Sequence, residues 1–279
     1  MTTARPATAA LDIAAIAREL KQAQDRAAQI EPFTAQFPGF DYGTALAVSR
    51  RVGEARRAEG FVPVGRKIGF TNSSLWPVYG VHAPIWGTMY DRTVAWLDGA
   101  AARCSLRGFA EPRIEPEIVF GLRSTPAPKA GEAELLRSIE WVAHGFEIVQ
   151  SHFPGWKFKA ADTVADNGLH GALLLGRPRV VTDLGEDLVE TLKSFSVALF
   201  SDGGLRETGR GSNVLGSPLA ALAHLVSVLA DDPGSEPLRE GEIVTTGTLT
   251  AAYPVRAGEV WETETGGLAL PGLRVEFTA

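Results

Sequence analysis

The 279-residue sequence has a single cysteine, Cys104, so the chain cannot form an internal disulfide. A lone cysteine is compatible with a reducing compartment. The N-terminal segment carries charges at Arg5, Asp12, Arg18 and Glu19, and no long apolar run follows them. This pattern argues against both a secretory signal and a membrane-spanning segment. We therefore expect a cytoplasmic protein that has no membrane partner.

An excess of basic residues is also missing. The chain has 27 lysine and arginine residues against 33 aspartate and glutamate residues, and the basic residues are scattered. The sequence therefore gives no sign of a basic patch that would bind a phosphate backbone, so nucleic acid is not expected as a partner. No glycine pattern opens a helix after a strand as a nucleotide-binding loop requires. The hydrophobic share of 45% fits one large folded domain or two small ones.

The first sixty residues show helical periodicity. Residues 1–10 are small and polar and are interpreted as a loose tail. Apolar positions from Leu11 to Ile30 follow a helical stripe. A second helix should begin after Asp41, a candidate N-cap, and end at Gly60. We predict that residues 1–60 form a tail and a helical cap.

Residues 61–279 change in character, because glycine and proline become frequent and β-branched residues cluster in short segments. A hairpin turn is predicted at Ser201–Gly204, and helices at Glu132–Trp141 and Pro218–Ala230. The predicted strands are Phe61–Phe70, Thr93–Leu97, Ile114–Leu122, Ala143–Ser151, Gly171–Leu175, Phe195–Phe200, Glu242–Thr246, Val260–Thr265 and Leu273–Phe277. We predict an α+β fold whose catalytic domain, residues 61–279, is a curved or rolled mixed sheet.

Two glutamates lie close together in the segment Arg113–Phe120. If this segment is a strand, Glu115 and Glu117 point to one face, because side chains alternate along a strand. Two neighbouring carboxylates repel each other, and a hard cation such as Mg²⁺ or Mn²⁺ would bind between them. Taken alone, however, the pair is more typical of an edge strand that faces solvent.

The surrounding sequence favours the metal site. Glu147 interrupts an apolar, strand-like run, where a carboxylate is costly unless it is paired or bound to metal. Three carboxylates would leave coordination positions for water and a bidentate substrate. Lys67 lies between Gly65 and Gly69, where a lysine could stabilise a developing oxyanion or exchange a proton. The acidic residues of the segment Asp162–Gly168 fit a structural turn instead.

Seven motifs follow one another in an order that resembles one family. They are K-I-G-F-T-N at Lys67–Asn72, P-x-x-G at Pro84–Gly87, R-I-E-P-E at Arg113–Glu117, F-E-I-V-Q-S at Phe146–Ser151, D-T-V-A-D-N at Asp162–Asn167, G-x-P-L at Gly216–Leu219 and T-G-T-L-T-A-A-Y-P-V at Thr246–Val255. Together they resemble the 2-keto-4-pentenoate hydratase and 4-oxalocrotonate decarboxylase branch of the fumarylacetoacetate hydrolase superfamily. The resemblance runs from about Asp41 to the C-terminus.

The resemblance implies a mixed β-roll of the fumarylacetoacetate hydrolase type, a Mg²⁺ or Mn²⁺ cofactor and a small 2-oxo acid substrate. It maps the metal ligands of the family onto Glu115, Glu117 and Glu147, and its active-site lysine onto Lys67. A homo-oligomer is also expected. The residues assigned to substrate binding are Phe70, Thr71, Tyr79, His82, Ile85, Asn167 and Thr248. A structural role is slightly favoured for two of these, Tyr79 and His82.

Two positions depart from the family pattern. Hydratases of the family carry an aspartate after the proline of the P-x-x-G turn, whereas this chain has Ile85, as in decarboxylase-like members. Gly168-Leu169-His170 replaces the small hydroxyl residues that usually follow A-D-N. The isoleucine favours decarboxylation. His170 favours hydration, because a histidine titrates in the range that proton transfer needs.

The sequence thus predicts a divalent-metal-dependent lyase that acts on a small 2-oxo acid through a metal-chelated enolate, with Lys67 and His170 as catalytic residues. Hydration of a 2-oxopent-4-enoate-like substrate is narrowly preferred to decarboxylation of a 4-oxalocrotonate-like substrate. Hydrolytic C–C cleavage of an acylpyruvate is a third possibility, disfavoured because no histidine precedes Lys67. A non-catalytic partner subunit is the alternative from a different class.

Overall fold

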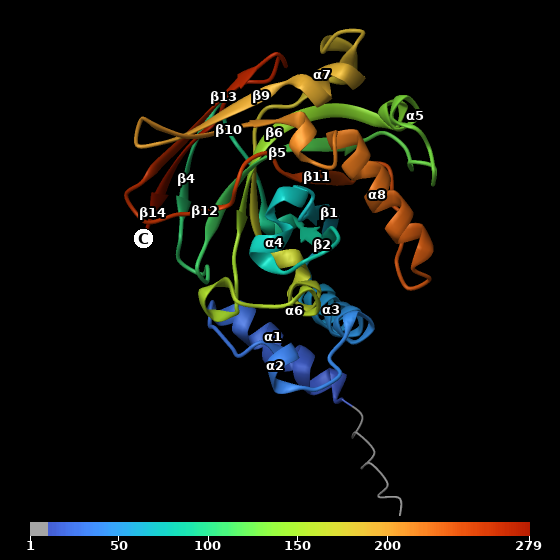
Figure 1. The fold of residues 1–279 in the computed structure, drawn as a ribbon, viewed down its shortest axis with the longest axis vertical. Coiled ribbons are helices and arrows are strands. Elements are labelled where there is room, and N and C mark those ends of the chain that lie inside the picture. The colour runs from blue at the N-terminus through green and yellow to red at the C-terminus, as the bar shows by residue number, and fades with distance from the viewer. Residues whose placement is uncertain (1–10) are drawn as a thin grey trace, which may run out of the picture.

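The computed structural model describes residues 11–279, and its N-terminal helices lie together at one end of the molecule (Figure 1). They are α1 (Ile13–Arg26), α2 (Phe33–Gln36) and α3 (Tyr42–Ala58). Asp41 caps α3 as predicted, because its Oδ1 accepts the Thr44 N–H at 2.8 Å. The first helix is shorter than predicted, since Ala27 adopts a left-handed conformation and ends it. The tail assigned to residues 1–10 lies outside the described residues, and the domain division at residue 60 stays a prediction.

The rest of the chain forms two curled sheets, which confirms the mixed α+β prediction. The nine-stranded sheet runs in the order β2 (Ile85–Tyr90), β1 (Pro63–Gly69), β11 (Ile243–Thr248), β5 (Arg113–Leu122), β6 (Ile139–Val149), β7 (His170–Leu175) and β3 (Val94–Trp96), with β12 (Tyr253–Pro254) on β5 and β8 (Arg179–Val180) on β6. The five-stranded sheet runs in the order β10 (Gly204–Arg210), β9 (Ser196–Ser201), β13 (Val260–Gly266), β14 (Arg274–Thr278) and β4 (Ala101–Ser105).

Apolar side chains fill the space between these layers. Phe146 and Ile148 of β6 pack in one cluster with Trp261, Val275 and Phe277 of the five-stranded sheet. Three further helices, α5 (Glu132–Arg137), α7 (Leu188–Ser194) and α8 (Pro218–Asp231), contribute to a second cluster with other strand residues. By length and composition alone, the stretch Gly211–Asp231 could cross a membrane, but half of its most apolar window is buried inside the protein.

Two local comparisons show where sequence patterns succeed and fail. The hairpin at residues 201–204 is confirmed, with Asp202 and Gly203 both at positive φ between β9 and β10. The helix predicted over Glu132–Trp141 ends at Arg137, and β6 begins at Ile139. Residues 139–141 form a strand and not a helix because Trp141 pairs with Gly121 of β5, whose missing side chain leaves room for the indole ring.

Candidate active site

Three carboxylates converge on one face of the paired strands β5 and β6. The antiparallel register places Glu115 directly opposite Glu147, and Glu117 lies two residues further along β5 on the same face. One carboxylate oxygen from each of the three lies within 4.8 Å of the others. Neighbouring β-strands thus bring together residues that are about thirty positions apart in the sequence.

The hydrogen bonds of this cluster leave two buried oxygens unused. Glu117 accepts the Gly247 N–H at 2.8 Å through Oε2. Glu147 accepts His170 Nδ1 at 2.8 Å through Oε1, which also lies 3.2 Å from Lys67 Nζ. Within residues 11–279, Glu117 Oε1 and Glu147 Oε2 have no partner. A buried acceptor without a donor is costly, and carboxylate oxygens are the ligands that Mg²⁺ and Mn²⁺ prefer, so the donor set fits such a cation.

The electrostatics of the cluster show the repulsion that a cation would relieve. Burial, together with the charge of Glu147, raises the pKa of Glu115 to about 7 despite the opposing charge of Lys67. The same two causes raise the pKa of Glu117 well above its usual value. Burial would also raise the pKa of Glu147, but the Lys67 charge and the His170 hydrogen bond outweigh it and lower that pKa to about 2. Glu147 therefore stays ionised, and its charge helps to raise the pKa values of Glu115 and Glu117.

Lys67 is buried at the edge of this cluster. Its Nζ donates to the Gly168 carbonyl at 3.0 Å. Burial would lower the pKa of Lys67, but the charges of Glu147, Glu115 and Glu117 outweigh that effect and raise it. The lysine therefore stays protonated at neutral pH, which suits a cation or hydrogen-bond donor better than a base.

A cavity of about 30 Å³ lies beside Lys67 and Glu115. Phe70, Tyr79 and Thr248, three of the predicted substrate-binding residues, line it. The Tyr79 hydroxyl accepts Arg113 Nη1 at 2.8 Å, and Tyr79 belongs to α4 (Trp76–Tyr79). The other lining residues are Gly69, Asn72, Leu75, Val149, Trp156, Gly168, Leu169 and Ala252.

The structure does not bring the other four predicted substrate-binding residues to this cavity. His82 is exposed, and Ile85 is buried in the apolar cluster of the cap. The Thr71 hydroxyl donates to the Thr246 carbonyl at 3.0 Å. Asn167 uses its whole amide on the backbone of Thr88, accepting the N–H at 2.7 Å and donating to the carbonyl at 2.9 Å. Thr71 and Asn167 thus bind backbone groups, and none of the four residues lines the cavity beside Lys67.

His170 also has a different position from the one expected of a proton carrier. It lines a second cavity and not the one beside Lys67. Both ring nitrogens are engaged, Nδ1 with Glu147 and Nε2 with Thr93 Oγ1 at 2.9 Å. Its contacts are those of a residue that positions a carboxylate, and its assignment to proton transfer with substrate stays a prediction.

Several contributors had no clear signal in the sequence. The Gly247 N–H and the Gly168 carbonyl are backbone groups, so no residue type marks them. Trp156 reaches the cavity from the short helical turn Pro154–Trp156, and Arg113 lies over its ring, 4.1 Å from the centroid. Gly168 and Gly247 both adopt positive φ, so the glycines in these two motifs were the sequence feature that could have marked the two positions.

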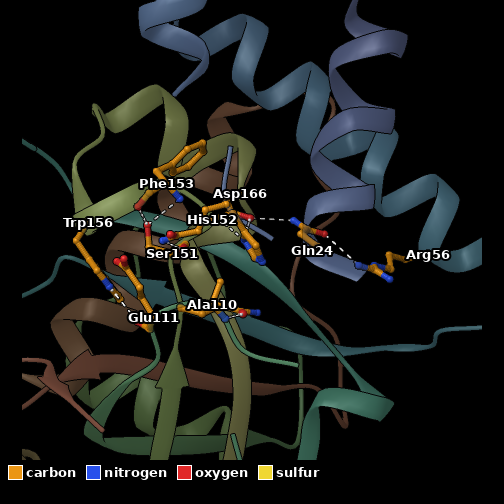
Figure 2. Close-up of polar contacts among 11 residues, drawn as sticks. Gln24, Arg56, Ala110, Glu111, Ser151, His152, Phe153, Trp156 and Asp166 are labelled. Carbon is orange, nitrogen blue, oxygen red and sulfur yellow. Dashed lines mark hydrogen bonds and ion pairs between the residues drawn. The ribbon is translucent and has the colours of Figure 1, made fainter. Parts of the chain in front are cut away.

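The structural role predicted for the aspartates of residues 162–168 is confirmed. Asp166 accepts His152 Nδ1 at 2.8 Å and Gln24 Nε2 at 3.0 Å, as Figure 2 shows. Arg56 of α3 continues this chain of contacts to Gln24. Asp162 accepts the Thr34 hydroxyl at 2.6 Å. The two aspartates thus join the loop after β6 and α6 (Ala160–Ala165) to the cap helices.

Comparison with known proteins agrees with this geometry. The family model "Fumarylacetoacetate (FAA) hydrolase C-terminal" matches residues 79–275. The chain is 30% identical to the 2-hydroxyhexa-2,4-dienoate hydratase of Comamonas testosteroni, over 94% of this chain and 96% of that one. It is 31% identical to the 2-keto-4-pentenoate hydratase of Burkholderia vietnamiensis, over 95% and 97%.

A solved structure is also similar to this chain. The 4-oxalocrotonate decarboxylase from Pseudomonas putida G7, complexed with magnesium and adipate, superposes with a TM-score of 0.85 at 25% identity. That match covers 95% of this chain and 97% of the decarboxylase. The chain belongs to the fumarylacetoacetate hydrolase family, in the branch that its motifs predicted. Within that branch it is an enzyme of the hydratase and decarboxylase type.

Proposed function

We propose that this enzyme adds water to a short 2-oxo-4-enoate, such as 2-oxopent-4-enoate, with Mg²⁺ or Mn²⁺ as its cofactor. The observation that carries the proposal is the pair of partnerless buried oxygens on Glu117 and Glu147 beside a protonated, buried Lys67. The names of the hydratase relatives support the reaction. In this proposal the enzyme is a cytoplasmic homo-oligomer.

Glu115, Glu117 and Glu147 would hold the cation. When bound, it would supply Lewis-acid polarisation of the 2-oxo acid. Lys67 would stabilise negative charge that develops on the substrate, because it is charged, buried and anchored by the Gly168 carbonyl. A group fixed in this way does not need to reorganise when charge develops.

Tyr79 is our candidate for the proton donor that the family aspartate would otherwise supply. Its hydroxyl oxygen accepts from Arg113, which leaves its own proton free for the cavity that it lines. Burial raises the pKa of Tyr79, with the Arg113 charge opposing, so the phenol keeps its proton at neutral pH. His170 acts indirectly in this scheme, by fixing Glu147.

Decarboxylation is the second candidate, and the cavity lining favours hydration over it. Lys67 and Glu115 are the only charged residues among those that line the cavity within residues 11–279. The lining also includes the apolar and aromatic residues Leu75, Val149 and Trp156. A hydrocarbon tail fits such a lining better than a second carboxylate does. The decarboxylase of known structure holds adipate, which is a dicarboxylate.

The test is product analysis with purified enzyme, 2-oxopent-4-enoate and Mg²⁺. We expect a hydrated product and no carbon dioxide, and loss of turnover in Glu117→Gln and Glu147→Gln. Glu264→Gln is the matched control, because Glu264 is an exposed residue on β13. Carbon dioxide release as the main reaction would replace the proposal with decarboxylation. Full turnover of both triad variants in chelator would refute the metal site.

A further inference from the structure

A second and larger cavity, of about 380 Å³, lies between α3 and the strands β1 and β2. It is on the opposite face of β1 from the carboxylates, because Arg66 lines it whereas the adjacent Lys67 lines the first cavity. Trp86, Thr88 and Tyr90 alternate along β2 and face the same space. Its volume falls in the range of cavities that hold small molecules.

The charged residues around this cavity are mainly arginines. Four of them line it, namely Arg50, Arg56, Arg57 and Arg66, against the two glutamates Glu54 and Glu236. Both glutamates are exposed, and both are already paired, with Arg51 at 3.1 Å and with Arg239 at 3.3 Å. Among the residues that line the cavity, arginines therefore outnumber glutamates by four to two.

The four arginines are not equally available. Arg50 is paired with Asp232 at 2.6 Å, and Arg56 is paired with Asp25. Arg57 is exposed at the rim and forms no ion pair within the part of the chain that the structure describes. Two arginines thus hold the walls of the cavity together, and Arg57 is free to meet a ligand.

Arg66 is the feature that points to a ligand. It is only 4% exposed, and its Cζ lies 5.9 Å from the centre of the Trp86 ring. Its Nη1 donates to the Gly65 carbonyl at 3.2 Å and forms an ion pair with Glu242 Oε1 at 3.5 Å. Its buried Nε has no partner within residues 11–279. An unsatisfied buried guanidinium N–H is costly, and an oxyanion is the partner that the fork of an arginine fits.

We propose that this cavity is a binding site for a small oxyanion, a carboxylate or a phosphate, held by Arg66 with Arg57 at the rim. The ring of Trp86 would support any carbon skeleton attached to that group. The site is distinct from the proposed active site, although His170 borders it and also holds Glu147. The proposal does not depend on the reaction that the enzyme catalyses.

The test is calorimetric titration of the full-length protein with inorganic phosphate and, separately, with succinate. The two ligands distinguish a phosphate site from a carboxylate site, and binding of either supports the proposal. Lys67→Met is used as the background for succinate, because it removes the charge that would hold a carboxylate in the first cavity and Lys67 does not line the second. We expect Arg66→Gln to weaken binding at least tenfold and Arg57→Gln to weaken it several-fold.

Arg103→Gln is the matched control, since Arg103 lies on β4 in the other sheet and is exposed. Its affinity should equal that of the parent protein. Arg57→Gln keeps the test valid if Arg66→Gln does not fold, because Arg57 is at the surface. Equal affinity in the Arg57 variant and the control, or no binding of either anion to the parent, would overturn the site. A changed oligomeric state of Arg57→Gln with unchanged anion affinity would assign the cavity to a subunit interface and also overturn it.

Discussion

The carboxylate triad should destabilise the protein in the absence of metal, and Glu115→Gln tests this directly. In the folded protein the pKa of Glu115 is raised from 4.5 to about 7, by burial first and then by Glu147. The folded state therefore binds this proton more tightly than the unfolded state does. Stability is unaffected by this residue below pH 4.5, falls as the pH rises toward 7, and stays low above it.

The size of the effect follows from the shift. A change from 4.5 to about 7 corresponds to about 3 kcal/mol of destabilisation at high pH. Glu115 is partly exposed, so solvent screening reduces this to roughly 1–2 kcal/mol. We expect Glu115→Gln to recover that amount at pH 8 in chelator. For a chain of this size the melting temperature should rise by roughly 2–6 °C.

The assay is thermal unfolding of wild type and variant at pH 4.5 and pH 8, each with EDTA and with Mg²⁺. The difference should vanish at pH 4.5. It should reverse at pH 8 with Mg²⁺, because only the wild type keeps all three ligands and gains the binding energy of the ion. Equal melting temperatures at pH 8 in EDTA would refute the repulsion argument. A variant that gains as much stability from Mg²⁺ as the wild type does would remove Glu115 from the metal site.

Four further predictions follow from the same contacts. Lys67→Met should lower kcat by a factor on the order of a hundred or more, and an unchanged rate would deny it an electrostatic role. Tyr79→Phe should lower kcat while leaving the Mg²⁺ affinity measured by calorimetry unchanged; a weakened affinity would place it in the metal site. His170→Ala should weaken Mg²⁺ binding roughly 10–100-fold, and loss of turnover at unchanged affinity would restore its role in proton transfer. Burial lowers the pKa of His144 from 6.5 to about 4, so between these pH values the unfolded state binds a proton that the folded state does not. The free energy of unfolding should therefore fall by about 3 kcal/mol as the pH drops from 6.5 to 4, and urea unfolding of His144→Gln should lack this loss.

The last of these predictions rests on contacts that fix the form of His144. Its Nδ1 lies 2.9 Å from the Glu117 carbonyl, which can only accept, so this nitrogen carries the proton. Its Nε2 lies 2.9 Å from Thr263 Oγ1. In the neutral ring Nε2 then has no proton, so it accepts from the Thr263 hydroxyl, whose oxygen accepts the Leu273 N–H at 3.0 Å. A second proton on the ring would break this arrangement.

Much of the metal site could be predicted from the sequence. The period of two along Arg113–Phe120 places Glu115 and Glu117 on one face, and the apolar run around Glu147 marks a carboxylate that needs a partner. Both arguments are local, because they use only the alternation of side chains in a strand. The order of the motifs was enough to place the chain in its family, which the comparisons confirm.

The roles of the residues around the triad depend on contacts between distant segments. The sequence marked His170 and Asn167 as candidates, yet one holds Glu147 and the other binds the backbone of Thr88. Nothing local to residues 165–170 shows that β2 passes beside them, or that Gly87 permits the close approach of Asn167.

The sequence by itself therefore predicted the central strands β5 and β6 and the shared face of Glu115 and Glu117, since these follow from periodicity and from the cost of burying charge. It did not predict β2, β4, β8 or β12, and Lys67 was indicated by its neighbouring glycines and by the family resemblance. Only the tertiary structure decided which side chains face the first cavity and which support it from behind. It also revealed the arginine-lined cavity, to which residues 24–66 and residues 234–236 contribute from opposite ends of the chain. The physical reason is that strand register and packing of the cap are set by long-range contacts, which no pattern within one segment contains.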